Sequence, residues 1–246
     1  MKEYNEIPGN GTGHRPPSGK SFTKKLDEIL LASDWEERIE YLDTSSATNL
    51  IAPLFTALCS KTSLIRWHGI TGFGIVLKSL TQKDYEKARD VMRRCIWNLN
   101  DESGGIGWGA PEVMGEIMAC SGELAREFYT FLFSYIHEEN DGMDNFLEFT
   151  PLRRGVFWGI SRLAQVYPEL VRRNRDTILR RIHVETEPEI IGLLCWTSGL
   201  IHMAEAVDFL RGHQHNSTEI ELYRDRILLK ISIGHLANEA LDLIGY

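Results

Sequence analysis

Long apolar runs are missing from this chain of 246 residues. The longest candidate, Ile190 to Ile201, has about 12 residues and contains Thr197 and Ser198, whereas a helix that crosses a bilayer needs about 18 or more. The N-terminus also lacks the apolar segment of a secretory signal. We therefore expect a cytoplasmic protein with no membrane as a partner.

Cysteine is scarce as well, and none of the four residues is paired at C-x-x-C spacing. Structural zinc sites are typically built from such closely spaced pairs, and disulfides occur mainly in oxidising compartments. Each cysteine instead lies in an apolar stretch with helical spacing, at Cys59, Cys95, Cys120 and Cys195. We expect four reduced thiols, with no metal and no cofactor.

A complete phosphate-binding loop is also absent, although the stretch "GTGHRPPSGKSF" ends like one. Five residues separate Gly13 from Gly19, where the motif has four. Pro16 and Pro17 remove two of the backbone N–H donors on which such a loop depends. No strand pattern precedes the stretch. We expect residues 1–20 to form a flexible arm without a role in nucleotide binding.

The net charge of -8 is distributed unevenly. Residues 99–150 carry eleven acids and one base, whereas residues 151–183 carry eight arginines and two acids. Acidic and basic segments that pack side by side would explain this contrast, and so would an anion-binding face. The overall acidity makes nucleic acid a disfavoured partner.

From residue 21 onward the apolar residues follow a helical period. Tyr85, Ala88, Met92, Cys95 and Leu99, for example, recur at steps of three or four and so share one helix face.

Residues that commonly begin helices agree with this period. Ser21 and Ser232 are expected N-caps, Thr81 is expected to precede a helix, and Thr150 is an N-cap followed by Pro151 at the first helical position.

Four stretches resemble one another and each carries a tryptophan at its second position. They are "RWHGITGFGIV", "GWGAPEVMGEI", "FWGISRLAQVY" and "CWTSGLIHMAE", with Trp67, Trp108, Trp158 and Trp196 at intervals of 41, 50 and 38 residues. Pairs of helices that repeat at about 40 residues are typical of α-solenoids. We expect the four tryptophans to be largely buried in the first helices of successive pairs.

The chain thus resembles the HEAT-like repeat superfamily of armadillo-like α-solenoids. Its fold class is all-α, an α-α superhelix of about five helix pairs at 21–59, 62–99, 106–138, 150–183 and 187–212. "NDESGGIGWGAPEVMGEIMA" and "FLEFTPLRRGVFWGISRLAQ" are similar to a functionally uncharacterised bacterial HEAT-like group. That resemblance implies a fold and no activity.

The C-terminal segment departs from the helical period. Ile220 and Leu222 alternate with Glu219 and Glu221, which predicts a β-hairpin with its turn at residues 224–226. A capping helix follows, and this end piece is expected to cover the last repeat. The predicted domains are an arm at 1–20, HEAT-like repeats at 21–212, and the hairpin with its capping helix at 213–246.

The candidate binding site is an inter-repeat edge formed by residues 100–112 and 144–154. Two long connections, one rich in glycine, meet helix N-termini there, and such loops often carry function. The acids favour a cation, an amine or an arginine side chain over an anion. The candidate residues are Arg66, His68, Asp101, Glu102, Trp108, Glu112, Glu116, Asn145, Glu148 and Arg154.

Each of these residues also has a structural interpretation, as an ion pair, a helix-capping acid or a packed ring. With no catalytic arrangement in the sequence, we expect a non-catalytic scaffold that binds a protein or a charged ligand. The alternatives are a nucleic-acid-binding or DNA-repair type of HEAT-like enzyme, and a small-molecule or metal enzyme that uses the Gly-rich loop.

Overall fold

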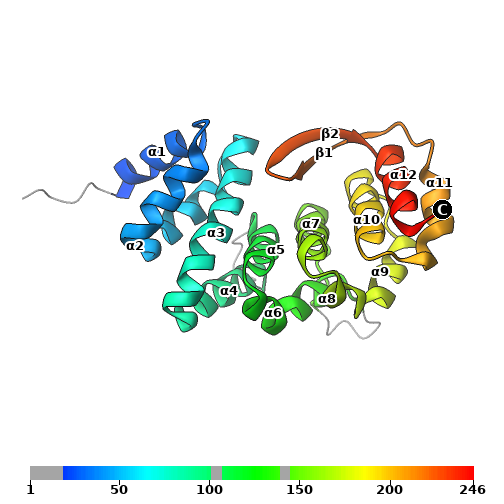
Figure 1. Ribbon diagram of the computed structural model, residues 1–246, viewed down its shortest axis with the longest axis horizontal. Coiled ribbons are helices and arrows are strands. Elements are labelled where there is room, and N and C mark those ends of the chain that lie inside the picture. The colour runs from blue at the N-terminus through cyan, green and yellow to red at the C-terminus, as the bar shows by residue number, and fades with distance from the viewer. Residues whose placement is uncertain (1–18, 101–106, 139–144) are drawn as a thin grey trace, which may run out of the picture.

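The computed structural model of the protein describes residues 19–100, 107–138 and 145–246, apart from the side chains of residues 19–24 and 44–47. Within these ranges the helices follow one another in pairs along an arc, and a two-stranded hairpin spans the open side of the arc (Figure 1). The predicted fold class, an α-solenoid with a small C-terminal hairpin, is confirmed.

Four inner helices line the concave side of the arc. They are α3 (Ser63–Lys83), α5 (Ala110–Cys120), α7 (Thr150–Val166) and α10 (Pro188–Leu200). They run in the same direction. Between α5 and α7, for example, Glu112 lies on Gly155 and Glu116, four residues later, pairs with Arg162, seven residues later, so the contacts proceed in the same direction along both helices. Their first turns therefore lie along one edge of the solenoid.

The outer helices lie on the convex side (Figure 1). They are α4 (Tyr85–Asn100), α6 (Gly122–Ser134), α8 (Pro168–Arg172), α9 (Arg175–Ile182) and α11 (Val207–His213), the last preceded by the short 3₁₀ helix η1 (Ala204–Ala206). The first pair consists of α1 (Gly19–Leu30) and α2 (Trp35–Ala57). The five pairs match those predicted from the sequence.

Small residues set the close approach of the inner helices. A Cβ atom built on Gly115 of α5 would lie 2.3 Å from the Cα atom of Gly159 in α7, so the two backbones touch. Glycine at these two positions therefore serves helix packing, and the close approach brings the side chains of the two inner helices within reach of one another.

Some predicted helix starts are wrong. Helix α1 begins at Gly19, so Ser21 is inside it. Thr81 lies within α3 because its hydroxyl donates to Leu77 O (2.7 Å), and the next helix begins after Asp84, whose carboxylate accepts from Lys87 N (3.2 Å).

Two other predicted helix starts agree with the structure to within one residue. Helix α7 begins at Thr150 itself, one residue earlier than expected, with Pro151 in its first turn. Ser232 caps the C-terminal helix α12 (Ile233–Ile244) as predicted, accepting from His235 N.

The hairpin consists of β1 (Glu219–Arg224) and β2 (Ile227–Ser232), paired antiparallel from Glu219 opposite Ser232 to Arg224 opposite Ile227. Asp225 and Arg226 form the turn, and both have positive φ angles (53° and 66°). This conformation is that of a two-residue hairpin turn, which matches the right-handed twist of the strands.

Helix α12 covers the last repeat, as predicted for the end piece, and Ile220 of β1 also meets Gly192 of α10. The hairpin extends further. It crosses the concave side from α12 toward the N-terminal helices (Figure 1), where Arg226 pairs with Glu36 of α2. Helix α12 packs against α10, with Ala240 against Gly199. The hairpin and helix α12 follow different paths because Ile220 and Leu222 of β1 are buried against the inner helices.

Candidate functional site

A cavity of about 530 Å³ opens on the concave side, between the first halves of the inner helices and strand β1. This volume falls within the range of about 300–1,000 Å³ that is usual for ligand sites. We call it the central pocket. Its lining residues are Leu58, Cys59, Ser60, Arg66, Trp67, Ile70, Trp108, Gly109, Glu112, Pro151, Leu152, Arg154, Trp158, Glu189, Leu193, Ile220, Glu221 and Leu222.

Glu112, in the first turn of α5, lies between the two arginines of the pocket. Its carboxylate rests on the backbone of α7, because a Cβ atom built on Gly155 would lie 2.5 Å from its Oε2 atom. Burial raises the pKa of Glu112 to about 7, against the opposing effect of the charges of Arg154 and Arg66. Neither arginine approaches it within ion-pair distance in the described part of the chain.

Both arginines have other partners. Arg66 donates to Ser60 O (2.9 Å) and to the hydroxyl of Ser63 (3.1 Å). Arg154 lies 3.7 Å from a carboxylate oxygen of Glu189, the first-turn acid of α10. Because the guanidinium groups are already engaged, they hold Glu112 in place only through their charge.

Tryptophans form the wall of the pocket next to the hairpin. The Trp67 ring of α3 stacks on Tyr223 of β1, with centroids 4.9 Å apart, and also contacts the ring of Trp158. The indole N–H of Trp158 donates to Tyr223 O (2.8 Å), and the Tyr223 hydroxyl is hydrogen-bonded to Thr71 (3.0 Å). These contacts fix β1 across the inner helices as one side of the pocket.

The expectation that all four tryptophans are largely buried is wrong for Trp108. Trp158 and Trp196 are buried, but Trp67 is only partly buried and Trp108 is 42% exposed. Trp108 precedes α5, whereas the other three lie inside their helices, so the sequence alignment does not mark equivalent positions. At the rim of the pocket it meets Phe149 edge to face.

The structure brings together Arg66, Trp108, Glu112 and Arg154 from the predicted site. His68 points elsewhere: it stacks on Trp35 and donates from Nδ1 to Leu30 O, and burial lowers its pKa. It therefore has the packing role that was its structural alternative.

Other predicted residues also lie away from the pocket. Glu116 is one turn further along α5, where it accepts from Arg162 (2.6 Å) beneath the hairpin. Asn145 and Glu148 are exposed and do not line the pocket. Asp101 and Glu102 fall outside the described residues. Glu189, Glu221 and the apolar residues of β1 also line the pocket, although they were not among the predicted residues.

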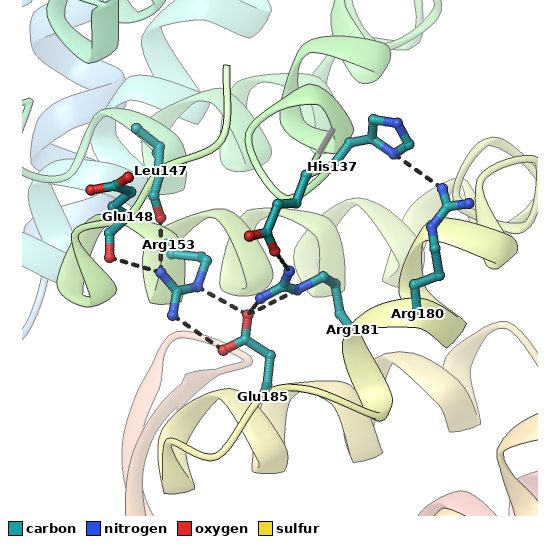
Figure 2. Close-up of polar contacts among 8 residues, drawn as sticks. His137, Leu147, Glu148, Arg153, Arg180, Arg181 and Glu185 are labelled. Carbon is teal, nitrogen blue, oxygen red and sulfur yellow. Dashed lines mark hydrogen bonds and ion pairs between the residues drawn. The ribbon is translucent and has the colours of Figure 1, made fainter. Parts of the chain in front are cut away.

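The connection before α7 is held by a separate buried ion cluster (Figure 2). Arg153 donates to Leu147 O and Glu148 O, and its guanidinium pairs with Glu185 (3.0 Å). Glu185, whose side chain is 2% exposed, also pairs with Arg181 of α9. With every charge paired and little solvent access, this cluster positions the connection.

The arginine-rich segment is largely engaged within the chain. Arg162 pairs with Glu116 and Arg181 with Glu138, so basic residues of 151–183 meet acids of 99–150. Side-by-side packing of the two segments therefore accounts for part of the charge contrast.

Two features are absent from the residues that the structure describes. These residues contain no group of three or more histidine, cysteine, aspartate or glutamate side chains placed to hold a metal ion. None of the helices in the described ranges is long and apolar enough to span a membrane.

Solved structures of designed armadillo repeat proteins are similar to this chain along nearly its whole length. One is 14% identical and has a TM-score of 0.52, covering 94% of this chain and 96% of its own. A second, designed for modular peptide recognition, is 14% identical with a TM-score of 0.51 and covers 92% of this chain and 93% of its own.

A third such structure, in complex with the peptide (KR)4, is 15% identical, has a TM-score of 0.53 and covers 92% of each chain. No family model and no curated protein sequence matches the chain. The structural likeness establishes the armadillo/HEAT-like α-solenoid fold.

Proposed function

We propose that this protein is a non-catalytic α-solenoid scaffold that binds a cationic segment of a partner protein in the central pocket. The observation that carries the proposal is Glu112, a partly buried carboxylate that has no ion-pair partner within the described chain and borders a cavity walled by tryptophans.

The balance of charges in the pocket supports a cation as the ligand. Three carboxylates and two guanidinium groups line it. Both guanidinium groups have partners, whereas Glu112 and Glu221 have none among the described side chains. A carboxylate held away from water without a partner is costly, and a lysine or arginine side chain would relieve that cost.

The aromatic wall supports the same ligand. A lysine or arginine placed over a tryptophan face gains about 0.5–2 kcal/mol, depending on how far the pair is desolvated. Trp67 and Trp108 both line the pocket, one in its wall and one at its rim. The similar designed solenoid in complex with the peptide (KR)4 supports a basic peptide as the ligand.

A location in the cytoplasm belongs to the same proposal. The four cysteines are free thiols, and Cys59 is exposed, as suits a reducing compartment.

Calorimetric titration with an alternating lysine–arginine peptide, and with an acidic peptide of equal length, tests this function. We expect binding of the basic peptide only. A bound cation lowers the pKa of Glu112, so the peptide favours the ionised carboxylate, and affinity should rise about tenfold from about pH 6 to about pH 8. The Glu112→Gln variant should bind weakly and without this pH dependence.

Cys59 supplies an independent readout, because it lines the pocket and is the exposed cysteine. The bound peptide should slow its alkylation by maleimide. Glu148→Gln is the matched control, since this exposed acid lies on the predicted edge but outside the pocket. Equal affinity for basic and acidic peptides, or no effect of Glu112→Gln, would show that the proposal is wrong.

A further inference from the structure

One edge of the hairpin borders the central pocket, and its backbone groups can be assigned from the strand register. The two-residue turn makes Arg224 and Ile227 a hydrogen-bonded pair, and in an antiparallel ladder such pairs alternate with non-hydrogen-bonded ones. Tyr223, Glu221 and Glu219 therefore direct their N–H and C=O groups away from β2.

Two contacts agree with this assignment. Tyr223 O accepts from the indole of Trp158, on the side of β1 away from β2. Ile233 N donates to Thr218 O (3.0 Å), which continues the same alternation beyond the strand. On the outward edge of β1, the carbonyl of Tyr223 is thus already paired with Trp158.

The next outward positions are unpaired. The backbone groups of Glu221 and Glu219 that point away from β2 have no hydrogen-bond partner within the described ranges. Both residues are exposed, and Ile220, Glu221 and Leu222 line the pocket. Unpaired backbone groups in a row on an exposed strand edge are a template for another strand.

We propose that the bound segment is an extended peptide that adds a third strand to the hairpin, along the edge of β1 at residues 219–221. This inference rests on the proposed function and specifies how the cationic segment is held. Backbone hydrogen bonds give such a strand its register, and its alternate side chains point to opposite faces.

The charges on the two faces of this edge define the segment. Side chains on the same face as Ile220 and Leu222 point toward the inner helices, where Glu112 lies in the pocket. Side chains on the other face lie beside the exposed carboxylates of Glu219 and Glu221. Because acids lie on both faces, consecutive basic residues are favoured in the bound peptide. The added strand ends at Tyr223, because the Trp158 indole already occupies the outward carbonyl there.

A proline at position 221 tests the strand addition on the intact chain. Glu221→Pro removes the outward N–H while leaving the hydrogen bonds between β1 and β2, because Glu221 and Lys230 form a non-hydrogen-bonded pair. Glu221→Gln removes the charge alone. Lys230→Pro makes the same backbone change on the opposite edge of the hairpin. Circular dichroism and thermal unfolding report whether each variant folds.

Affinity for a lysine–arginine peptide should be at least about tenfold lower for Glu221→Pro than for Glu221→Gln, since the backbone hydrogen bond is lost and the proline ring occupies its place. Lys230→Pro should bind like the unchanged protein. In the unchanged protein, the peptide should slow hydrogen exchange of the Glu221 amide, a measurement by NMR that needs no variant.

The outcomes separate the two proposals. If Glu221→Pro binds as well as Glu221→Gln and exchange of the Glu221 amide is unchanged, while Glu112→Gln still weakens binding, then strand addition is wrong and the pocket function stands. If no basic peptide binds the unchanged protein, both are wrong. The acids at 219 and 221 would then serve only to keep the strand edge from pairing.

Discussion

Replacing Glu112 by glutamine should stabilise the ligand-free protein at neutral and alkaline pH. Burial in the folded state raises the pKa of this carboxyl from its usual value of 4.5 to about 7. A full shift of that size corresponds to about 3 kcal/mol. Because the side chain is partly exposed, solvent screening reduces the expected gain to about 1–2 kcal/mol.

The sign follows from proton linkage. A carboxyl whose pKa is raised on folding binds its proton more tightly in the native state, so it stabilises the fold below about pH 4.5 and loses this contribution as the pH rises through about 7. Glutamine mimics the neutral acid at every pH. The difference between Glu112→Gln and the unchanged protein should therefore be small near pH 4.5 and complete at about pH 8.

Urea unfolding at several pH values measures this difference, with all other titrating groups common to both proteins. Glu148→Gln, an exposed change outside the pocket, should differ from the unchanged protein by less than about 0.5 kcal/mol throughout. If Glu112→Gln instead loses several kcal/mol at about pH 8, then Glu112 is a structural partner of Arg66 and Arg154, and the reasoning from an unpaired carboxylate fails.

Two further changes test the scaffold. Gly115→Ala should destabilise the protein by at least about 1–3 kcal/mol in urea unfolding, because the new methyl group meets the backbone of Gly159; an unchanged midpoint would contradict the close packing. Glu185→Gln should cost about 3–5 kcal/mol, because it leaves Arg153 and Arg181 short of a buried partner; a loss below 1 kcal/mol would show that solvent compensates them.

The repeat architecture was predictable because each helix pair is a local unit. The helices depend on local patterns that are visible in the sequence. These patterns are periodic apolar residues, prolines in first turns and small residues at helix contacts, and each extends over only a few residues. The ends of the helices were harder to predict where a residue can make either of two local contacts. Thr81 can bond to Leu77 O within α3 as readily as it can begin the next helix, and only packing decides between them.

The candidate site was predictable only in its first-turn residues. Parallel inner helices bring the first turns of successive repeats to one edge, so Arg66, Glu112 and Arg154 could be placed together before the structure was known. The length of each connection does not reveal how it packs. Glu148 belongs to a connection held by the buried Arg153 cluster, and its side chain remains outside the pocket.

The hairpin could be recognised from its alternation but not placed. Tyr223 meets Thr71, which is 152 residues away along the chain, and no local pattern records a contact of that range. That contact decides the character of the site. Without β1 the first turns of the inner helices would face an open groove, whereas with it they face a pocket that has a backbone edge for one wall. Strand β1, which is far from the inner helices along the sequence, thus gives the pocket the backbone edge by which it would select an extended segment.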